Sequence, residues 1–169
     1  MNQMRQISVE KVTLNIGAGK DQAKLDKGMK LINNIAGHVP VKTFTKKRIQ
    51  EWGLRPGLPI GCKLTLRNKE ALDLLKRLFE AKDNLLQASN LDNEGNISFG
   101  ISEYIDVPGV KYDPDIGIMG FQVCITLKRN GFRIKHRALK RHAIPMKHRI
   151  KKQEAINFMK NAFNLSIGE

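Results

Sequence analysis

The sequence has few cysteines, few aromatic residues and no long hydrophobic run. Its two cysteines, Cys62 and Cys124, lie far apart and outside any CxxC motif, so neither a disulfide framework nor a zinc ribbon is predicted. No apolar run approaches the roughly 18 residues that a membrane span needs, and the N-terminus lacks the apolar core of a signal peptide. These absences favour a cytoplasmic protein with no membrane partner.

The chain is also poor in acidic residues. Its 169 residues include 30 Lys and Arg but only 16 Asp and Glu, so the formal net charge is +14 and the sequence pI is near 10.0. Hydrophobic residues make up 41%, which is ordinary for a globular domain with its own core. Because like charges repel one another in a compact fold, this excess points to a polyanionic partner.

Most of the positive charge lies in one stretch. Residues 128–152 include eleven Lys or Arg and no acid, whereas residues 80–115 hold eight acids and two bases. The acidic stretch is expected to face water or protein. A charge run is often only a solvated surface, but eleven cations without a counter-charge favour a polyphosphate partner. The rRNA contacts predicted in the basic stretch are Lys128, Arg129, Arg133, Lys135, Arg137, Lys140 and Arg141.

Hydrophobic periodicity predicts an α+β fold. Strand-like alternation is strong at 11–16, 60–67 and 121–128 and weaker at 39–44 and 96–101. One apolar stripe at helical spacing marks 25–36, 71–79 and 155–163. Strands and helices with one apolar side each predict a single domain over 1–169, in which helices cover one face of an antiparallel sheet and the other face stays exposed. Within this domain we expect a basic segment at 128–152 and a C-terminal helix at about 152–163.

The polar face of the predicted sheet favours RNA contact. Lys, Arg, Thr, Asn, Gln and Gly line it, and the three strong strands carry no acid on it. Any solvent-facing sheet is polar, but short hydroxyl and amide groups suit RNA edges and 2′-hydroxyls, and cations suit phosphates. The RNA-binding residues predicted on and beside this face are Lys11, Thr13, Asn15, Lys42, Lys63, Thr65 and Arg67.

A long connection, residues 44–57, joins two of the candidate strands. It mixes cations with the only tryptophan, Trp52. Connections of this length usually either are mobile or reach a partner. Trp52 either anchors the loop against the core or stacks on a nucleotide, and the sequence does not decide between these.

No motif for catalysis, a cofactor or a metal is found. Gly17-Ala18-Gly19-Lys20 stands where a phosphate-binding loop would, but Leu14, Asp21 and Gln22 occupy the positions that a Walker or dinucleotide loop needs for Gly or Ser/Thr. The turn is therefore expected only to let the first helix pack back on the sheet. The four histidines lack the spacing of metal ligands, and no grouping suggests a nucleophile or an acid/base pair. We predict that the chain is not an enzyme and has no cofactor.

The order and spacing of several segments resemble a known family. They are VTLNIGAGK from Val12, IAGHVPVKT ending at Thr43, KKRIQEWGLRPGLPIGCKLTLR ending at Arg67, GNISFGISEY from Gly95 and YDPDIGIMGFQVCITL from Tyr112. Together they resemble the large-subunit ribosomal protein family five, the 5S rRNA-binding protein of the central protuberance. The long basic segment followed by EAINFMKNAF resembles the archaeal and eukaryotic branch.

The resemblance implies roles for particular residues. Positions matching Asn15, His38 and Thr65 lie in the family's RNA-reading surface, although the family usually has Gln where this chain has His38. Loop 45–57 resembles the one that approaches P-site tRNA, and the acidic stretch resembles a region facing a small-subunit head protein at an intersubunit bridge. Implied partners are thus 5S rRNA, large-subunit rRNA, P-site tRNA and neighbouring ribosomal proteins. The tRNA contacts expected in the loop are Lys46, Lys47, Arg48, Trp52 and Arg55.

Two other functions remain open from the sequence. A non-ribosomal RNA-binding regulator with the same basic face would bind many isolated RNAs, whereas the ribosomal protein would prefer 5S rRNA. A phosphate-handling enzyme would be stabilised by nucleotides, and the broken phosphate-loop motif argues against it.

Overall fold

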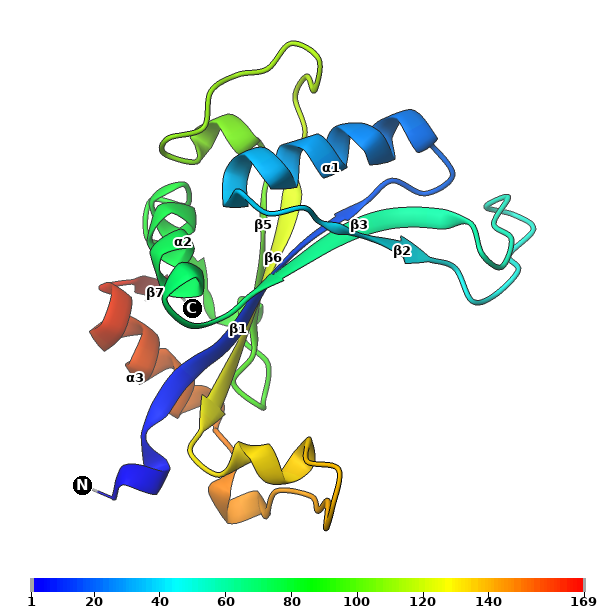
Figure 1. The fold of residues 1–169 in the computed structure, drawn as a ribbon. Helices are drawn as coiled ribbons and strands as arrows, with labels where there is room; N and C mark the ends of the chain where they lie inside the picture. Colours follow the sequence, from blue (N-terminus) through cyan, green and yellow to red (C-terminus); the bar gives the residue numbers. More distant parts are fainter. Residues whose placement is uncertain (1, 169) are drawn as a thin grey trace.

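A five-stranded antiparallel sheet forms the centre of the molecule (Figure 1). The computed structural model describes residues 2–168. The strands lie in the order β2-β3-β1-β6-β5. They span Val41–Phe44 (β2), Pro59–Leu66 (β3), Ile7–Gly17 (β1), Phe121–Arg129 (β6) and Ile97–Ile101 (β5).

Strands β5 and β6 and the second half of β1 bury every second side chain, as the alternation predicts. On the central strand β1, Val12 and Leu14 are fully buried and Ile16 is 3% exposed. Helices α1 (Gln22–Ala36) and α2 (Asn68–Glu80) pack their apolar stripes on this face of the sheet. The predicted α+β fold, with an antiparallel sheet covered by helices on one face, is confirmed.

The turn before α1 is structural. Gly19 has a φ of +63°, a conformation that glycine adopts without steric cost. The backbone N–H groups of Ala18 and Gly19 donate to the carbonyl of Ile60, at 2.9 and 3.0 Å. The side chain of Asp21 then caps α1 by accepting a hydrogen bond from the Lys24 N–H. The amides that a phosphate-binding loop would offer are therefore already used within the fold.

The C-terminal part closes the opposite end of the core. Helix α3 (Lys152–Phe163) places the ring of Phe163 5.2 Å from that of Phe79 on α2. Beyond α3, strand β7 (Ser166–Gly168) pairs in parallel with β4 (Leu85–Gln87). Short 3-10 helices complete the chain, at Gln3–Arg5 (η1), Ala88–Asn90 (η2), Tyr104–Asp106 (η3), Phe132–Lys135 (η4) and Met146–His148 (η5).

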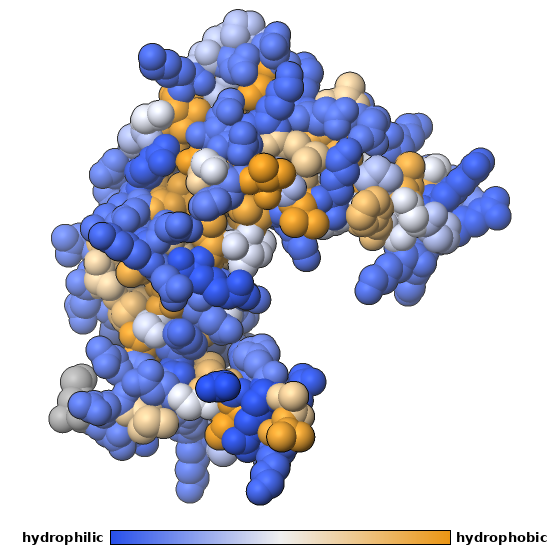
Figure 2. Space-filling model, in the orientation of Figure 1, coloured by the Kyte–Doolittle hydropathy of each residue, from blue (hydrophilic) through white to orange (hydrophobic). Residues whose placement is uncertain are grey.

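The molecule is hollowed on the side opposite its helices. Figure 1 shows α1, α2 and α3 on one side of the sheet, while the β2–β3 loop and the segment after β6 project from its two ends on the other. The space-filling view in Figure 2 shows the hollow between these two projections. The surfaces of the projections are largely hydrophilic. We call the sheet face that looks into the hollow the open face.

Candidate nucleic-acid interface

Polar side chains from the three middle strands meet on the open face. Thr13 on β1 lies opposite Thr65 on β3, with their hydroxyl oxygens 3.4 Å apart. Asn15 lies opposite Lys63 and donates from its amide to Gln122 on β6 at 3.3 Å. Lys63 is exposed, and the two threonines and Asn15 are half-buried. The structure thus brings these four predicted residues together on one face, and Lys11 follows them along β1.

Strands β6 and β5 extend the open face with residues that were not among the predicted contacts. Cys124 lies opposite Thr13 on one side and Ser98 on the other, and it is exposed. Gln122 lies on the same face of β6 as Cys124 and is exposed too. The alternation at 121–128 already placed these side chains on the polar face, and this pattern was the signal for including them.

The prediction that this layer carries no acid is wrong at one end of β1. The strand begins at Ile7, earlier than the alternation indicated, and therefore includes Glu10 at an irregularity in the β1–β6 pairing. The carboxylate of Glu10 lies 3.6 Å from Nε2 of His136, and its second oxygen is buried without a hydrogen-bond partner. This acid is turned toward the basic segment and borders the face instead of lying in its middle.

The basic segment between β6 and α3 is folded. We call residues 130–151 the basic lobe. Its small centre is the buried Phe132, whose ring packs edge-on against His148 at 5.8 Å and lies under the Lys135 ammonium at 5.2 Å. The exposed cations of the lobe are Arg133, Arg137, Lys140, Arg141, Lys147, Arg149 and Lys151.

Arg129 is a correction to the predicted contacts. Its side chain is only 4% exposed and lies 2.7 Å from the carboxylate of Glu154 on α3. One guanidinium nitrogen also donates to the carbonyls of His148 and Arg149, at 3.3 and 3.4 Å. A buried and paired guanidinium is unavailable to phosphates, so Arg129 is withdrawn as an rRNA contact. Instead it ties the end of the basic lobe and the start of α3 to β6.

The contact with Arg129 also affects the pKa of Glu154. The backbone N–H of Lys151 donates to its carboxylate at 2.9 Å, and this hydrogen bond, together with the charge of Arg129, lowers the pKa of Glu154 below its ordinary value. The carboxylate therefore stays ionised through the neutral and mildly acidic range. It balances the buried cation and closes the first turn of α3.

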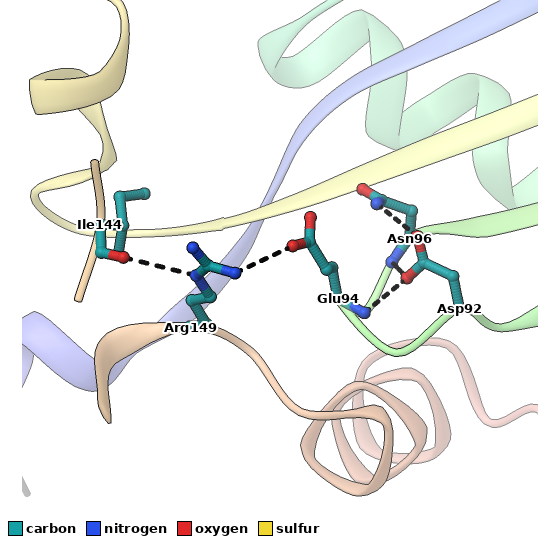
Figure 3. Close-up of polar contacts among 5 residues, drawn as sticks. All are labelled: Asp92, Glu94, Asn96, Ile144 and Arg149. Atoms are coloured by element: carbon teal, nitrogen blue, oxygen red, sulfur yellow. Dashed lines mark hydrogen bonds and ion pairs between the residues drawn. The ribbon is translucent and has the colours of Figure 1, made fainter. Parts of the chain in front are cut away.

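A second tie holds the basic lobe to the turn before β5 (Figure 3). Arg149 donates to the carbonyl of Ile144 at 3.4 Å and to the carboxylate of Glu94 at 3.3 Å. Asp92 fixes the turn that carries Glu94 by accepting from the backbone N–H groups of Glu94 and Asn96, at 2.9 and 2.7 Å. The lobe is thus attached to the body of the protein on two sides.

Loop 45–57, the projection between β2 and β3, is closed at its base. The hydroxyl of Thr45 donates to the carbonyls of Arg55 and Leu58, at 2.6 and 3.0 Å. Leu54 is 7% exposed and is the residue that anchors the loop, whereas Trp52 is 65% exposed. The alternative in which Trp52 anchors the loop against the core is therefore wrong. The predicted cations Lys46, Lys47, Arg48 and Arg55 are all exposed.

Lys42 is a second correction. On β2 it lies opposite Cys62, which is fully buried on the face covered by α1. Its ammonium accordingly lies 3.7 Å from Asp26 on α1. Because Lys42 points to the helix side of the sheet, its predicted place on the open face is wrong. The edge of that face is formed on β2 by Val41, which lies opposite Lys63 and is 63% exposed.

His38 and Arg67 lie at the end of the open face where β3 runs into α2. Nε2 of His38 is 3.2 Å from the carboxylate of Glu70, and its side chain is half exposed. Arg67 is exposed and precedes the first residue of α2. Both residues line the same hollow as Thr65.

The second half of the acidic stretch lies away from the open face. It forms the connection between β5 and β6, which projects beyond α1 at the top of Figure 1. Buried Tyr104 organises this connection, since its hydroxyl accepts a hydrogen bond from the Asp113 N–H at 2.8 Å. The acids of the connection, such as Asp106 and Asp115, are exposed.

Features of other kinds of site are not found in the described chain. Among residues 2–168 no group of His, Cys, Asp and Glu could hold a metal ion. None of the described helices is long and apolar enough to cross a membrane. Burial raises the pKa of the Cys62 thiol to about 11, which makes it a poor nucleophile.

Comparisons with known proteins match most of the chain to one family. The model of the family described as ribosomal protein L5 matches residues 2–55, and the model of the C-terminus of this ribosomal family matches residues 59–158. The chain belongs to the ribosomal L5 family. It is 47% identical over 168 residues to the large ribosomal subunit protein uL5 of Sulfolobus acidocaldarius, covering 99% of this chain and 94% of that protein. With the protein of the same name from Methanosphaera stadtmanae, identity is 43% over 167 residues, 99% of either chain.

Membership of the L5 family confirms the resemblance seen in the sequence, including its archaeal character. The chain is a ribosomal protein of the large subunit, and the expected location in the ribosome is confirmed. The relatives are named as ribosomal proteins and not as enzymes. The reading as a regulator outside the ribosome is thereby disfavoured.

Proposed function

We propose that this L5 protein binds 5S rRNA through the open face and helps to anchor it in the central protuberance. The observation that carries the proposal is the cluster of Thr13, Asn15, Lys63 and Thr65 on the sheet face opposite the helices. Side-chain hydroxyls and amides on a broad shallow surface suit the minor groove of an RNA helix, where 2′-hydroxyls and base edges are displayed. Lys63 adds a charge for the phosphates beside them.

The basic lobe provides the second part of the proposed interface. It flanks the open face, and most of its cations are exposed without a carboxylate partner among the described residues. We assign its exposed cations to rRNA of the large subunit, with Lys128 at the junction of the lobe and the sheet. Because the lobe is tied to β6 by Arg129 and to the β5 turn by Arg149, its charges are held in place before RNA binds. Such preorganisation lowers the entropy lost on association.

Loop 45–57 and the acidic stretch are assigned to other partners. The loop projects beyond the sheet with four exposed cations and exposed Trp52, a combination that suits a backbone and a base of P-site tRNA. The acidic connection between β5 and β6 lies far from this charge and suits a basic protein of the small-subunit head at an intersubunit bridge. Both assignments follow the family resemblance and the distribution of charge.

Selective binding tests the proposed function. The purified protein is titrated into 5S rRNA from Sulfolobus acidocaldarius, and into a structured RNA of equal length and composition, at a fixed salt concentration. We expect 5S rRNA to bind at least about tenfold more tightly, since shape and unpaired bases add to the phosphate term. Equal affinity for the two RNAs would contradict the proposal and favour a general RNA binder.

A further inference from the structure

A hollow of about 620 Å³ lies at the end of the open face. It is formed where β3 passes into α2, and the loop between α1 and β2 closes its other side with His38 and Val39. Thr65, which we place in the RNA interface, is part of its wall. The hollow is therefore continuous with the surface proposed to hold RNA.

The hollow combines an apolar wall with an oriented ring. Val39 is 76% exposed, although a valine is normally buried, and it lies beside the nearly buried Leu64 and Leu66. The imidazole of His38 is half exposed and is held by the Glu70 carboxylate at 3.2 Å. An aromatic ring beside exposed aliphatic groups offers a surface on which a nucleobase can stack.

The rim of the hollow is cationic. Arg67 and Lys69 line it, both are exposed, and within residues 2–168 neither forms an ion pair. The one carboxylate in the lining belongs to Glu70, which His38 already engages. A phosphate beside a stacked base would find two cations within the same hollow.

We infer that this hollow receives a single unpaired nucleotide from the RNA that lies on the open face. The inference rests on the proposed function and adds what is recognised at this end of the interface. The volume falls within the range of roughly 300–1,000 Å³ typical of small-ligand sites, so one nucleotide fits but a double helix does not. Proteins read RNA sequence mainly at such unpaired bases, which can be turned out of the helix and stacked on side chains.

Two variants and a matched control test the inference. Val39→Glu adds a carboxylate to the wall at an exposed position, Lys69→Gln removes one rim charge, and Lys76→Gln removes an exposed charge elsewhere on α2. Each protein is titrated with 5S rRNA and with a fully paired RNA duplex. Val39→Glu is expected to weaken 5S rRNA binding about tenfold, as for loss of one stacked base, and to leave the duplex affinity within about twofold. Lys69→Gln should also weaken 5S rRNA binding, by a smaller factor. Lys76→Gln should not weaken 5S rRNA binding.

The remaining outcomes separate the inference from the proposed function. Equal losses on 5S rRNA and duplex, or no loss with either RNA, would overturn the unpaired-nucleotide site. If the unaltered protein itself does not prefer 5S rRNA, the proposed function fails and the inference fails with it. As a further test, the protein is titrated with free nucleotides, namely AMP, GMP, CMP and UMP. No saturation is expected below millimolar concentration, and micromolar binding would overturn RNA as the source of the nucleotide.

Ultraviolet crosslinking of the 5S rRNA complex, read by mass spectrometry, gives an independent result. Peptides containing His38 and Val39, or Arg67 and Lys69, are expected to carry an unpaired nucleotide of 5S rRNA. Crosslinks from these peptides only to paired nucleotides would refute the inference, as would crosslinks from Cys124 with none from these peptides.

Discussion

Neutralising three cations of the basic lobe should flatten the salt dependence of RNA binding. Arg133, Arg141 and Lys147 are exposed, and their side chains form no ion pair or hydrogen bond among the described residues. Each duplex phosphate that a cation neutralises contributes about 0.9 to the slope of log affinity against log salt. If each of the three meets one phosphate, changing all three to Gln lowers the slope by about 2.7.

This difference is large enough to measure by titration. When salt is raised from about 0.1 to about 0.2 M, the unaltered protein should lose about sixfold more affinity for 5S rRNA than the triple variant. Changing Lys24, Lys27 and Lys30 to Gln removes the same charge from the exposed side of α1, which faces away from the proposed interface. An unchanged slope in the lobe variant, or an equal change in the α1 variant, would refute a specific role for the lobe.

The open face and the α3 junction give two further predictions. Replacing Asn15 or Thr65 with Ala should weaken 5S rRNA binding by roughly 1 to 3 kcal/mol without lowering the melting temperature, and unchanged affinity in both variants would exclude these contacts. Glu154→Gln should lower the melting temperature at pH 7, by about 2–4 °C for each kcal/mol lost. The hydrogen bond from Lys151 and the charge of Arg129 lower the pKa of Glu154, so its contribution is present above the ordinary carboxyl value of 4.5 and lost as pH falls through the folded-state value. The difference between variant and unaltered protein should therefore shrink at pH 3, and a constant difference would contradict the ion pair.

The sequence predicted the sheet and its helices well because burial imposes a period on them. Strands covered on one side alternate strictly, as in Val12, Leu14 and Ile16, and every segment with that signal became a strand. The paired strands β4 and β7 have three residues each, which is too few to show a period, and the sequence did not predict them. The extension of β1 to Ile7 was missed because the irregularity at Glu10 breaks the alternation.

The candidate site was predicted less completely, since charge along a sequence does not reveal the direction of a side chain. Lys42 belongs to a basic cluster, but the two-residue period of β2 turns it toward Asp26. Arg129 continues a run of cations, but it is the last residue of β6 and falls on the buried phase of that strand. Identifying Glu154 as its partner requires the packing of α3, which local sequence does not specify.

The accessibility of Cys124 tests the RNA-binding face most directly. This thiol is exposed on β6 between Thr13 and Ser98, whereas Cys62 is buried and has its pKa raised to about 11, so a thiol reagent should modify the free protein quickly at Cys124 alone. The rate is measured with and without saturating 5S rRNA, and the modified site is identified by mass spectrometry. We predict that bound 5S rRNA protects Cys124. An unchanged rate of modification in the saturated complex would show that RNA does not lie on the open face.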